Sequence, residues 1–217
     1  MTYHDRAQGI STMRRRLVGA ILPAALAAGA VLFGRSASAQ TKPPRVKVAT
    51  ELGDFVVEVY PDRAPISANN FLAYVDKGLL DGQSAYRIVT IANQPADTAY
   101  KIEVIQFGWR GAEGQEPPLP RIAHETTDVI GLKHLDGTLS MARLATGTAS
   151  AGFFICIGDQ PSLDFGGGRH PDRQGFAAFG RVIEGMDVVR HIHATRAEPV
   201  DRLAKPIAIT RATRMPS

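Results

Sequence analysis

Side chains that can do covalent or metal chemistry occur in this sequence, but their spacing does not assemble such a site. The only cysteine, Cys156, lies in the apolar run 153–157, where we expect an inert buried thiol rather than an exposed nucleophile. The six histidines are scattered, and His191 and His193 are two residues apart, so they would not face one another on a helix. Three or four converging zinc ligands cannot be assembled from them. The sequence therefore predicts neither a metal site nor a cysteine nucleophile.

The motifs of nucleotide binding and acyl transfer are also missing. The sequence has no phosphate-binding loop, no dinucleotide-binding glycine pattern after a strand, and no Gly-x-Ser-x-Gly turn that would expose a serine nucleophile. The glycine run at 166–168 predicts only a flexible turn. We therefore expect a protein that works without a cofactor.

The excess basic charge of the chain is confined to its N-terminal segment. The 217 residues include 25 Lys and Arg and 21 Asp and Glu, which gives a formal net charge of +4. Residues 1–39 hold five of the basic side chains and one of the acidic ones, so the remainder has 20 of each. A neutral domain lacks the positive surface that a nucleic-acid backbone requires. We therefore expect no nucleic-acid partner.

The N-terminal segment has the pattern of an export signal. Three arginines at 14–16 precede an apolar stretch at 17–33, and Ala37-Ser38-Ala39 supplies the small residues that a signal peptidase accepts. The apolar stretch is short for a membrane span and contains Pro23. We therefore expect cleavage after Ala39, while an uncleaved anchor and a twin-arginine export route both stay open.

Cleavage at this point would divide the chain into three parts. These are a signal peptide at 1–39, a polar linker at 40–45 and a single domain at 46–217. We expect the mature domain to be exported to the periplasm, to be a monomer, and to have no stable membrane span once the signal is removed.

Short alternations of apolar and polar residues predict a mainly β domain. Two such runs at 46–50 and 55–59, on either side of Leu52-Gly53-Asp54, predict a β-hairpin. Further strands are expected at 85–91, 101–109, 137–143, 153–157, 176–183 and near 206–211. Many short strands with one early and one late helix indicate a closed or nearly closed antiparallel barrel capped by helices.

Two helices are expected to cap this barrel. The first has Ser67 as its N-cap and ends at Gly78. The second carries Met186, Val189 and Ile192 on one apolar face. Long polar stretches between the expected elements predict either functional surface loops or poorly ordered segments.

Three separated parts of the sequence occur together, and in the same order, in one known protein family. They are Tyr86-Arg87 followed by Val104–Gln106, Gly137–Ala142 continuing into Gly152–Ile155, and Phe176–Val189. In this order they resemble the cyclophilins, which are peptidyl-prolyl cis-trans isomerases. The resemblance covers 46–209, and it implies a closed, eight-stranded, antiparallel β-barrel capped by two α-helices. It also implies that the partners of the protein are proline-containing polypeptides.

The resemblance assigns the chemistry to two residues. Arg87 would be catalytic and would donate a hydrogen bond to the prolyl nitrogen, while Gln106 would position Arg87 or the substrate carbonyl. Rotation about the amide has a barrier of about 18–20 kcal/mol. The barrier falls when the nitrogen lone pair leaves conjugation, a state that a fixed, charged donor stabilises. The substrate-binding residues that the resemblance implies are Val104, Met141, Ala142, Arg143, Phe154, Leu163 and Phe176.

Some positions of this implied site depart from the family pattern. Ala85-Tyr86-Arg87 stands where Phe-His-Arg is usual, Gly152 replaces a glutamine, and Ser162 replaces a large residue. The segment between Arg87 and Gln106 is longer than usual by roughly ten residues, which a loop can accommodate. The alternative function is therefore a catalytically weak or inactive cyclophilin-like module that binds proline-containing segments.

Overall fold

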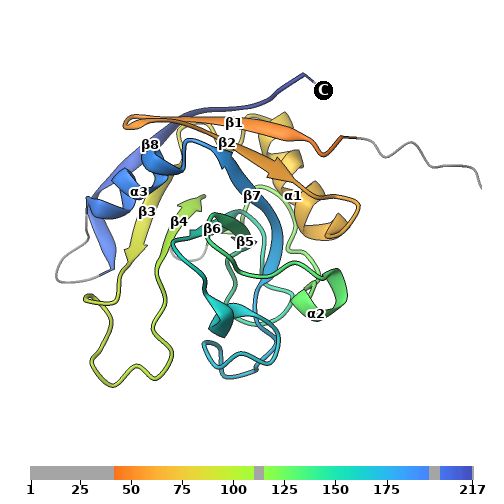
Figure 1. Ribbon diagram of the computed structural model, residues 1–217. Helices are drawn as coiled ribbons and strands as arrows, with labels where there is room; N and C mark the ends of the chain where they lie inside the picture. Colours follow the sequence, from red (N-terminus) through yellow and green to blue (C-terminus); the bar gives the residue numbers. More distant parts are fainter. Residues whose placement is uncertain (1–41, 110–114, 196–200, 217) are drawn as a thin grey trace, which may run out of the picture. The chain divides into compact units, whose positions relative to one another are not determined.

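The computed structural model describes residues 42–109, 115–195 and 201–216, and the expected signal peptide lies outside these ranges. The strands are β1 (Arg45–Thr50), β2 (Gly53–Val59), β3 (Ser84–Val89), β4 (Val104–Gly108), β5 (Thr138–Met141), β6 (Gly152–Cys156), β7 (Ala177–Glu184) and β8 (Arg202–Arg214). They form a closed barrel in the order β1-β2-β7-β5-β6-β4-β3-β8 (Figure 1), and every neighbouring pair is antiparallel. The predicted eight-stranded antiparallel barrel is confirmed.

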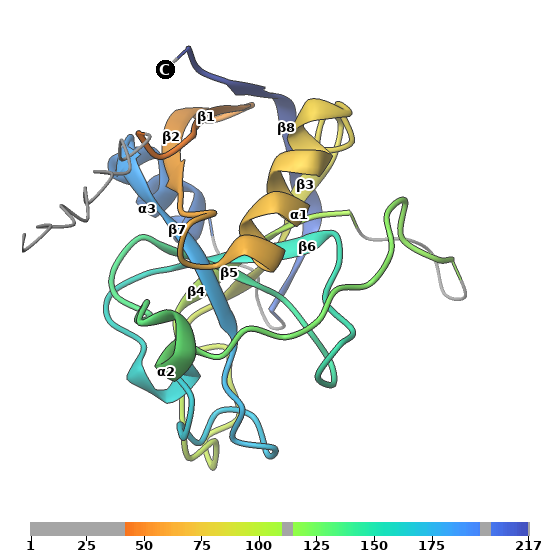
Figure 2. The same ribbon diagram turned by 90° about the vertical axis from the view of Figure 1, so that its right-hand side faces the viewer.

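In the described ranges, three α-helices and one short 3-10 helix accompany the barrel (Figure 2). They are α1 (Pro65–Asp76), α2 (Thr127–Ile130), α3 (Met186–Ala194) and the 3-10 helix η1 (Pro161–Leu163). The helices α1 and α3 are the two expected from the sequence, and Val189 and Ile192 of α3 are fully buried. The single turn of α2 was not predicted, and it ends at Gly131, whose φ of 67° suits a left-handed C-cap. Every helix within the described ranges is too short or too polar to span a bilayer.

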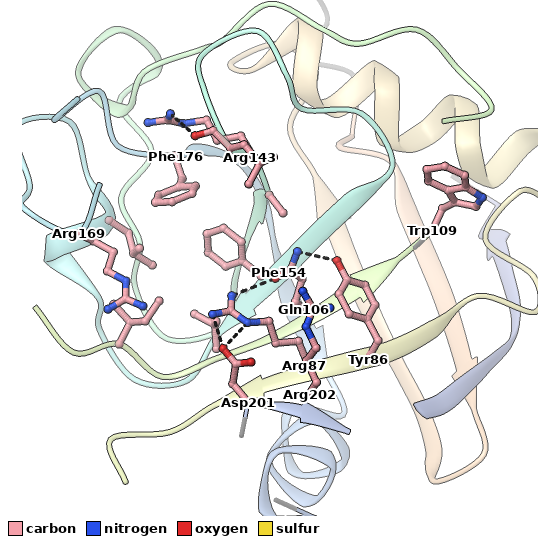
Figure 3. Close-up of a pocket in the computed structure, with 15 residues that line it drawn as sticks. Tyr86, Arg87, Gln106, Trp109, Arg143, Phe154, Arg169, Phe176, Asp201 and Arg202 are labelled. Carbon is pink, nitrogen blue, oxygen red and sulfur yellow. Dashed lines mark hydrogen bonds and ion pairs between the residues drawn. The ribbon is translucent and has the colours of Figure 1, made fainter. Parts of the chain in front are cut away.

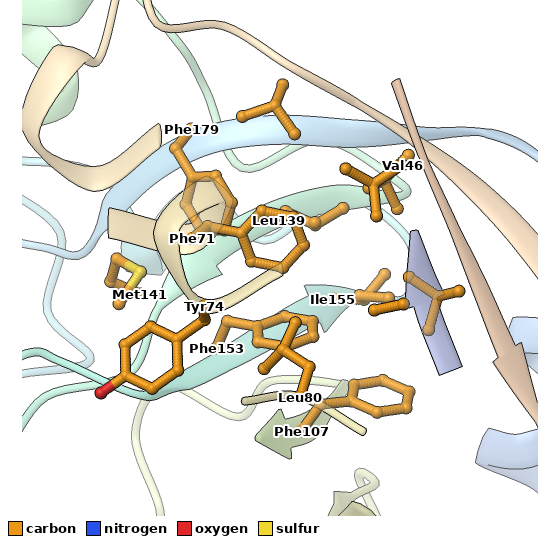
Figure 4. Close-up of a cluster of buried hydrophobic side chains, with 14 of the residues drawn as sticks. Val46, Phe71, Tyr74, Leu80, Phe107, Leu139, Met141, Phe153, Ile155 and Phe179 are labelled. Atoms are coloured by element: carbon orange, nitrogen blue, oxygen red, sulfur yellow. The ribbon is translucent and has the colours of Figure 1, made fainter. Parts of the chain in front are cut away.

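Alternate side chains of the strands fill the barrel interior. The rings of Phe107 on β4 and Phe153 on β6 stack with their centroids 5.5 Å apart (Figure 4). Phe71 of α1 meets Phe153 edge-on at 5.2 Å and lies 5.3 Å from Phe179 on β7. The α1 helix is therefore joined to the barrel by ring contacts within one continuous core.

The N-terminus of α1 differs from the sequence prediction. The helix begins at Pro65, a position that tolerates the missing N–H, with Ala64 as the N-cap residue. Ser67 therefore lies inside the first turn, fully buried, and its hydroxyl has no hydrogen-bond partner. The carboxylate of Glu125 instead accepts hydrogen bonds from the N–H groups of Ile66 and Ser67, at 3.0 and 2.7 Å. A charged side chain from a distant loop caps the helix, so the predicted cap at Ser67 is wrong.

A buried polar chain joins β5 to the residue that follows η1. Nδ1 of His134 lies 2.8 Å from Oδ1 of Asp164, and its Nε2 lies 2.9 Å from Oγ of Ser140. Burial lowers the pKa of His134, although Asp164 acts in the opposite direction. Burial by itself would raise the pKa of Asp164, but hydrogen bonds from His134 bring that pKa below its ordinary value. The folded state therefore favours a neutral imidazole beside an ionised carboxylate.

Replacing Ser67 with Ala should stabilise the protein. The change removes a buried hydroxyl that has no partner and introduces a better helix former, so we expect the free energy of unfolding to rise by about 1 kcal/mol. Urea denaturation measures this change. Ser150→Ala is the matched control and should destabilise the protein, because the Ser150 hydroxyl lies 3.0 Å from the Tyr74 hydroxyl and donates to the carbonyl of Leu119 at 2.9 Å. A loss of stability in Ser67→Ala would contradict the absence of a partner.

The stability of the fold should decrease as the pH falls below about 6.5, the ordinary pKa of a histidine. The pKa values of His134 and Asp164 are both lowered in the folded protein. The unfolded chain then binds more protons, and the stabilising contribution of the pair is lost towards acid pH. Melting temperatures should fall between about pH 7.5 and 5.5, and His134→Gln should weaken this dependence. An identical pH dependence in the two proteins would contradict the role of His134.

Candidate active site

A β-bulge in β3 places two consecutive side chains on the same side of the barrel wall. The register of β3 against β4 pairs Ala85 with Phe107 and then Arg87 with Gln106, so Tyr86 is the extra residue. Ala85 is fully buried in the core, whereas Tyr86 and Arg87 both line a pocket on the outside of the barrel wall. The bulge therefore interrupts the regular alternation and turns Tyr86 and Arg87 outward together.

Arg87 lies at the centre of a chain of polar contacts (Figure 3). Its Nε donates to Oδ2 of Asp201 at 2.7 Å, and its Nη2 lies 2.6 Å from the same oxygen. Its Nη1 donates to Oε1 of Gln106 at 3.3 Å, and the amide of Gln106 donates to the hydroxyl of Tyr86 at 2.6 Å. A guanidinium has five N–H donors, and contacts with the described residues engage three of them, which leaves two for a ligand.

A small apolar cluster, separate from the main core, lies next to these donors. Its buried members are Val89, Ile102, Val104, Phe154, Cys156 and Leu163. Phe176 packs on this cluster, with its ring centroid 5.5 Å from that of Phe154 and the two rings 85° apart. Four members of the cluster, together with Phe176, Arg87 and Gln106, line a pocket of about 600 Å³. The pocket therefore combines an apolar floor with fixed cationic donors.

The structure brings most of the predicted site residues into this one pocket. Its lining includes Arg87, Gln106, Val104, Ala142, Arg143, Phe154, Leu163 and Phe176. Met141 is the exception, because its side chain is 2% exposed and lies in the main core of the barrel. Consecutive residues of a strand point to opposite faces, so Ala142 reaches the pocket and Met141 does not. The structure thus corrects the predicted placement of Met141.

The Arg143 side chain is held within the pocket wall. Its Nη1 and Nη2 donate to the carboxylate of Asp172 at 2.7 and 2.9 Å, and its Nε donates to the carbonyl of Gly175 at 2.9 Å. Hydrogen bonds from Arg143 lower the pKa of Asp172 well below its ordinary value. The guanidinium carbon also lies 5.1 Å from the ring centroid of Phe176. Arg143 therefore supports the aromatic part of the wall.

Other lining residues were not among those predicted to form the site. They are Tyr86, Ile102, Trp109, Leu144, Arg169, Asp201 and Arg202. Ile102 could have been found from strand alternation, because it stands two positions before Val104. Asp201 and Arg169 come from segments far from Arg87 in the sequence, and no local pattern singles them out.

The cysteine and the possible metal ligands lie apart from this chemistry. Cys156 is fully buried, and burial raises the pKa of its thiol well above the ordinary value, so the expected burial of this side chain is confirmed. In the part of the chain that the structure describes, no group of three or more His, Cys, Asp or Glu side chains could hold a metal ion.

Comparisons with known proteins agree with this fold. The family model for cyclophilin type peptidyl-prolyl cis-trans isomerase/CLD matches residues 45–214. The isomerase CYP18-2 of Arabidopsis thaliana is 31% identical over 180 residues, which cover 81% of this chain and 96% of the relative. Peptidyl-prolyl cis-trans isomerase A of Dickeya dadantii is 30% identical over 182 residues, 81% of this chain and 87% of the relative.

A solved structure shares the same architecture. The cyclophilin type peptidyl-prolyl cis-trans isomerase of Cryptosporidium parvum superposes with a TM-score of 0.63 at 19% sequence identity, over 81% of this chain and 99% of that one. The matched family model and the two relatives extend the likeness from the fold to the sequence. The chain therefore belongs to the family of cyclophilin-type peptidyl-prolyl cis-trans isomerases.

Proposed function

We propose that this protein accelerates the cis-trans isomerisation of X–Pro bonds in exported polypeptides, with Arg87 as the catalytic residue. The observation that carries the proposal is the arrangement of Arg87. Among the described residues, Asp201 and Gln106 engage three of its five N–H donors, and two donors remain available beside the apolar floor. Isomerisation breaks no covalent bond, so a site of this kind needs only to bind the proline and stabilise the twisted amide.

The apolar floor provides the binding part of the reaction. A proline ring that rests on Phe154, Leu163 and Phe176 would be removed from water, and its burial contributes about 25 cal/mol per Å² of apolar area. Val104, which is 3% exposed, extends this surface towards Gln106 along β4. The ring would then be anchored while the residue before proline rotates.

The polar chain provides the catalytic part. When the amide twists, the prolyl nitrogen becomes pyramidal and gains a lone pair that can accept a hydrogen bond. A free Arg87 donor directed at this nitrogen stabilises the twisted state more than the planar one, and only such a difference lowers the barrier. Asp201 and Gln106 hold the guanidinium in place before the substrate arrives, so little reorganisation is required.

The export part of the proposal is supported by the sequence of the leader. The arginines at 14–16, the apolar stretch at 17–33 and the Ala37-Ser38-Ala39 pattern are those of a cleaved signal. Slow X–Pro isomerisation limits the folding of many chains, so an exported isomerase would act on polypeptides that fold after translocation. We propose that the mature protein works there as a monomer.

A binding module that does not catalyse is the second candidate. The observation in its favour is the Asp201 carboxylate, which lies 2.6 Å from Nη2 of Arg87 and offsets the charge of that residue. The two remaining guanidinium donors favour the enzyme.

Replacing Arg87 should separate the two candidates. We expect the wild-type protein to accelerate the exchange of an Ala-Pro peptide between its cis and trans forms, and Arg87→Ala to lose most of this activity, by about 100-fold or more, because the donor to the prolyl nitrogen is gone. Exchange NMR spectroscopy measures both rates. Arg211→Ala, at an exposed position of β8, is the matched control. Exchange no faster than in buffer for the wild type would eliminate the enzyme, and equal rates for wild type and Arg87→Ala would remove Arg87 from catalysis.

Replacing Asp201 should reveal its positioning role. Asp201→Ala removes two of the three contacts of Arg87, so we expect kcat to fall by about tenfold while KM changes little, because the apolar floor is untouched. The melting temperature should stay close to that of the wild type, since the Asp201 side chain is 30% exposed. An increase in kcat would show instead that the carboxylate inhibits Arg87 by offsetting its charge.

A further inference from the structure

Arg169 enters the pocket at the end opposite Trp109 (Figure 3). The guanidinium of Arg169 lines the pocket together with Arg87, Asp201 and Arg202. Its Nη1 donates to Oε1 of Gln94 at 3.0 Å and to the carbonyl of Tyr100 at 2.9 Å. Both acceptors are neutral, so these bonds orient the guanidinium without offsetting its charge.

Both acceptors belong to the segment that lengthens the connection between Arg87 and Gln106. The amide of Gln94 donates to the carbonyls of Thr90 and Ile102 at 2.7 and 2.8 Å, and its oxygen accepts from the N–H of Ile102 at 3.1 Å. Gln94 is 8% exposed, so its amide lies at the centre of a closed, hydrogen-bonded loop. The inserted segment is therefore built around the group that holds Arg169.

The loop that carries Arg169 fits closely against the inserted segment. A Cβ at Gly168 would lie 2.2 Å from the ring of Tyr100, which is 52% exposed, so a larger residue here would require this ring to move. The glycine run was expected to be a flexible turn, and the structure packs Gly168 against the inserted segment.

The pocket carries more positive than negative charge. Four arginines line it, and Asp201 is the one acidic side chain among the described residues of the lining. Arg143 is paired with Asp172, and Arg87 is paired with Asp201. Within the described ranges no carboxylate lies within ion-pair distance of Arg169 or Arg202, the latter exposed on β8 in register with Arg87. Of these two, Arg169 lies at the end of the pocket opposite Trp109 and is available there to an anion (Figure 3).

The environment of Arg169 agrees with an uncompensated charge. Burial lowers the pKa of its guanidinium, the neighbouring charge of Arg87 lowers it further, and only Asp201 acts in the opposite direction. A guanidinium remains cationic at neutral pH even so, because its ordinary pKa lies far above 7. An anionic group of a ligand would relieve this repulsion.

We propose that Arg169 forms an anion subsite that recognises an acidic group, a carboxylate or a phosphate, on a residue next to the substrate proline. The inference rests on the proposed function, because it takes the proline to lie on the Phe154–Phe176 floor. Consecutive Cα atoms are about 3.8 Å apart, so a side chain one residue from the proline can reach the other end of a pocket of this size. Guanidinium groups bind carboxylates and phosphates with paired hydrogen bonds.

The test compares exchange rates of matched peptides by NMR. One set carries Glu, Gln, Ser or phosphoserine directly before the proline, and a second set carries the same residues directly after it. We expect the wild-type protein to prefer the acidic member of at least one set over its neutral counterpart by about three- to fivefold in kcat/KM, the range of a partly exposed ion pair. A preference for Glu over Gln identifies a carboxylate site, and a preference only for phosphoserine identifies a phosphate site.

Variants of Arg169 assign this preference to its guanidinium. Arg169→Gln should reduce the ratio of acidic to neutral rates towards one, whereas Arg169→Lys should keep part of the preference because the charge remains. Arg211→Gln, which removes the same charge from an exposed position of β8, should leave the ratio unchanged. Raising the salt concentration should reduce the ratio in the wild type, which provides the test even if Arg169→Gln does not fold.

The two proposals fail in different ways. Acceleration of all peptides with equal rates for acidic and neutral members would overturn the anion subsite and leave the isomerase intact. A preference that survives unchanged in Arg169→Gln would also overturn the subsite. No acceleration of any peptide would overturn the isomerase. In that case, equal affinities of acidic and neutral peptides, measured by titration calorimetry, would overturn the subsite as well.

Discussion

The pairing of β3 with β4 across the bulge at Tyr86 sets the geometry on which the whole site depends. In a regular strand Tyr86 and Arg87 would point to opposite faces, and one of two polar side chains would enter a core built from phenylalanine rings. The extra residue keeps Ala85 inside and places both polar side chains outside, while Arg87 stays opposite Gln106. The arginine thus stands on a strand whose position is fixed by barrel closure, and neighbouring loops need only complete its surroundings.

Features that depend on local patterns could be predicted from the sequence. The strands and the two main helices follow from the spacing of apolar residues, and the resemblance placed them in a barrel. Strand ends were less accurate, as β8 illustrates. It was expected near 206–211, yet it runs from Arg202 to Arg214. Its register against β3 skips between Ile207 and Arg202, so Pro206 occupies an irregular stretch where no ladder bond is needed.

Features that depend on contacts between distant segments could not be predicted in this way. Ser67 looks like a helix cap, but Glu125 supplies the capping oxygens from 58 residues away. Asp201 meets Arg87 across 114 residues, and Arg169 meets Gln94 across 75. Each of these interactions joins a loop residue or the start of a strand to a distant part of the chain, and no periodic pattern accompanies it. The floor of the pocket could be predicted through the family resemblance, whereas its charged rim could not.

The closed barrel also determines how a flexible chain can be held. All eight strands have a hydrogen-bonded neighbour on both sides, so within the described residues the sheet offers no unpaired edge. An unfolded polypeptide that visits the pocket cannot add itself as a further strand, and the complex cannot become a template for intermolecular sheet growth. Under the proposed function, the closed sheet would thereby protect the protein from co-aggregating with partly folded chains. A bound polypeptide would then be contacted only by side chains and by the backbone of loops. Contacts of this kind favour rapid dissociation over a stable complex.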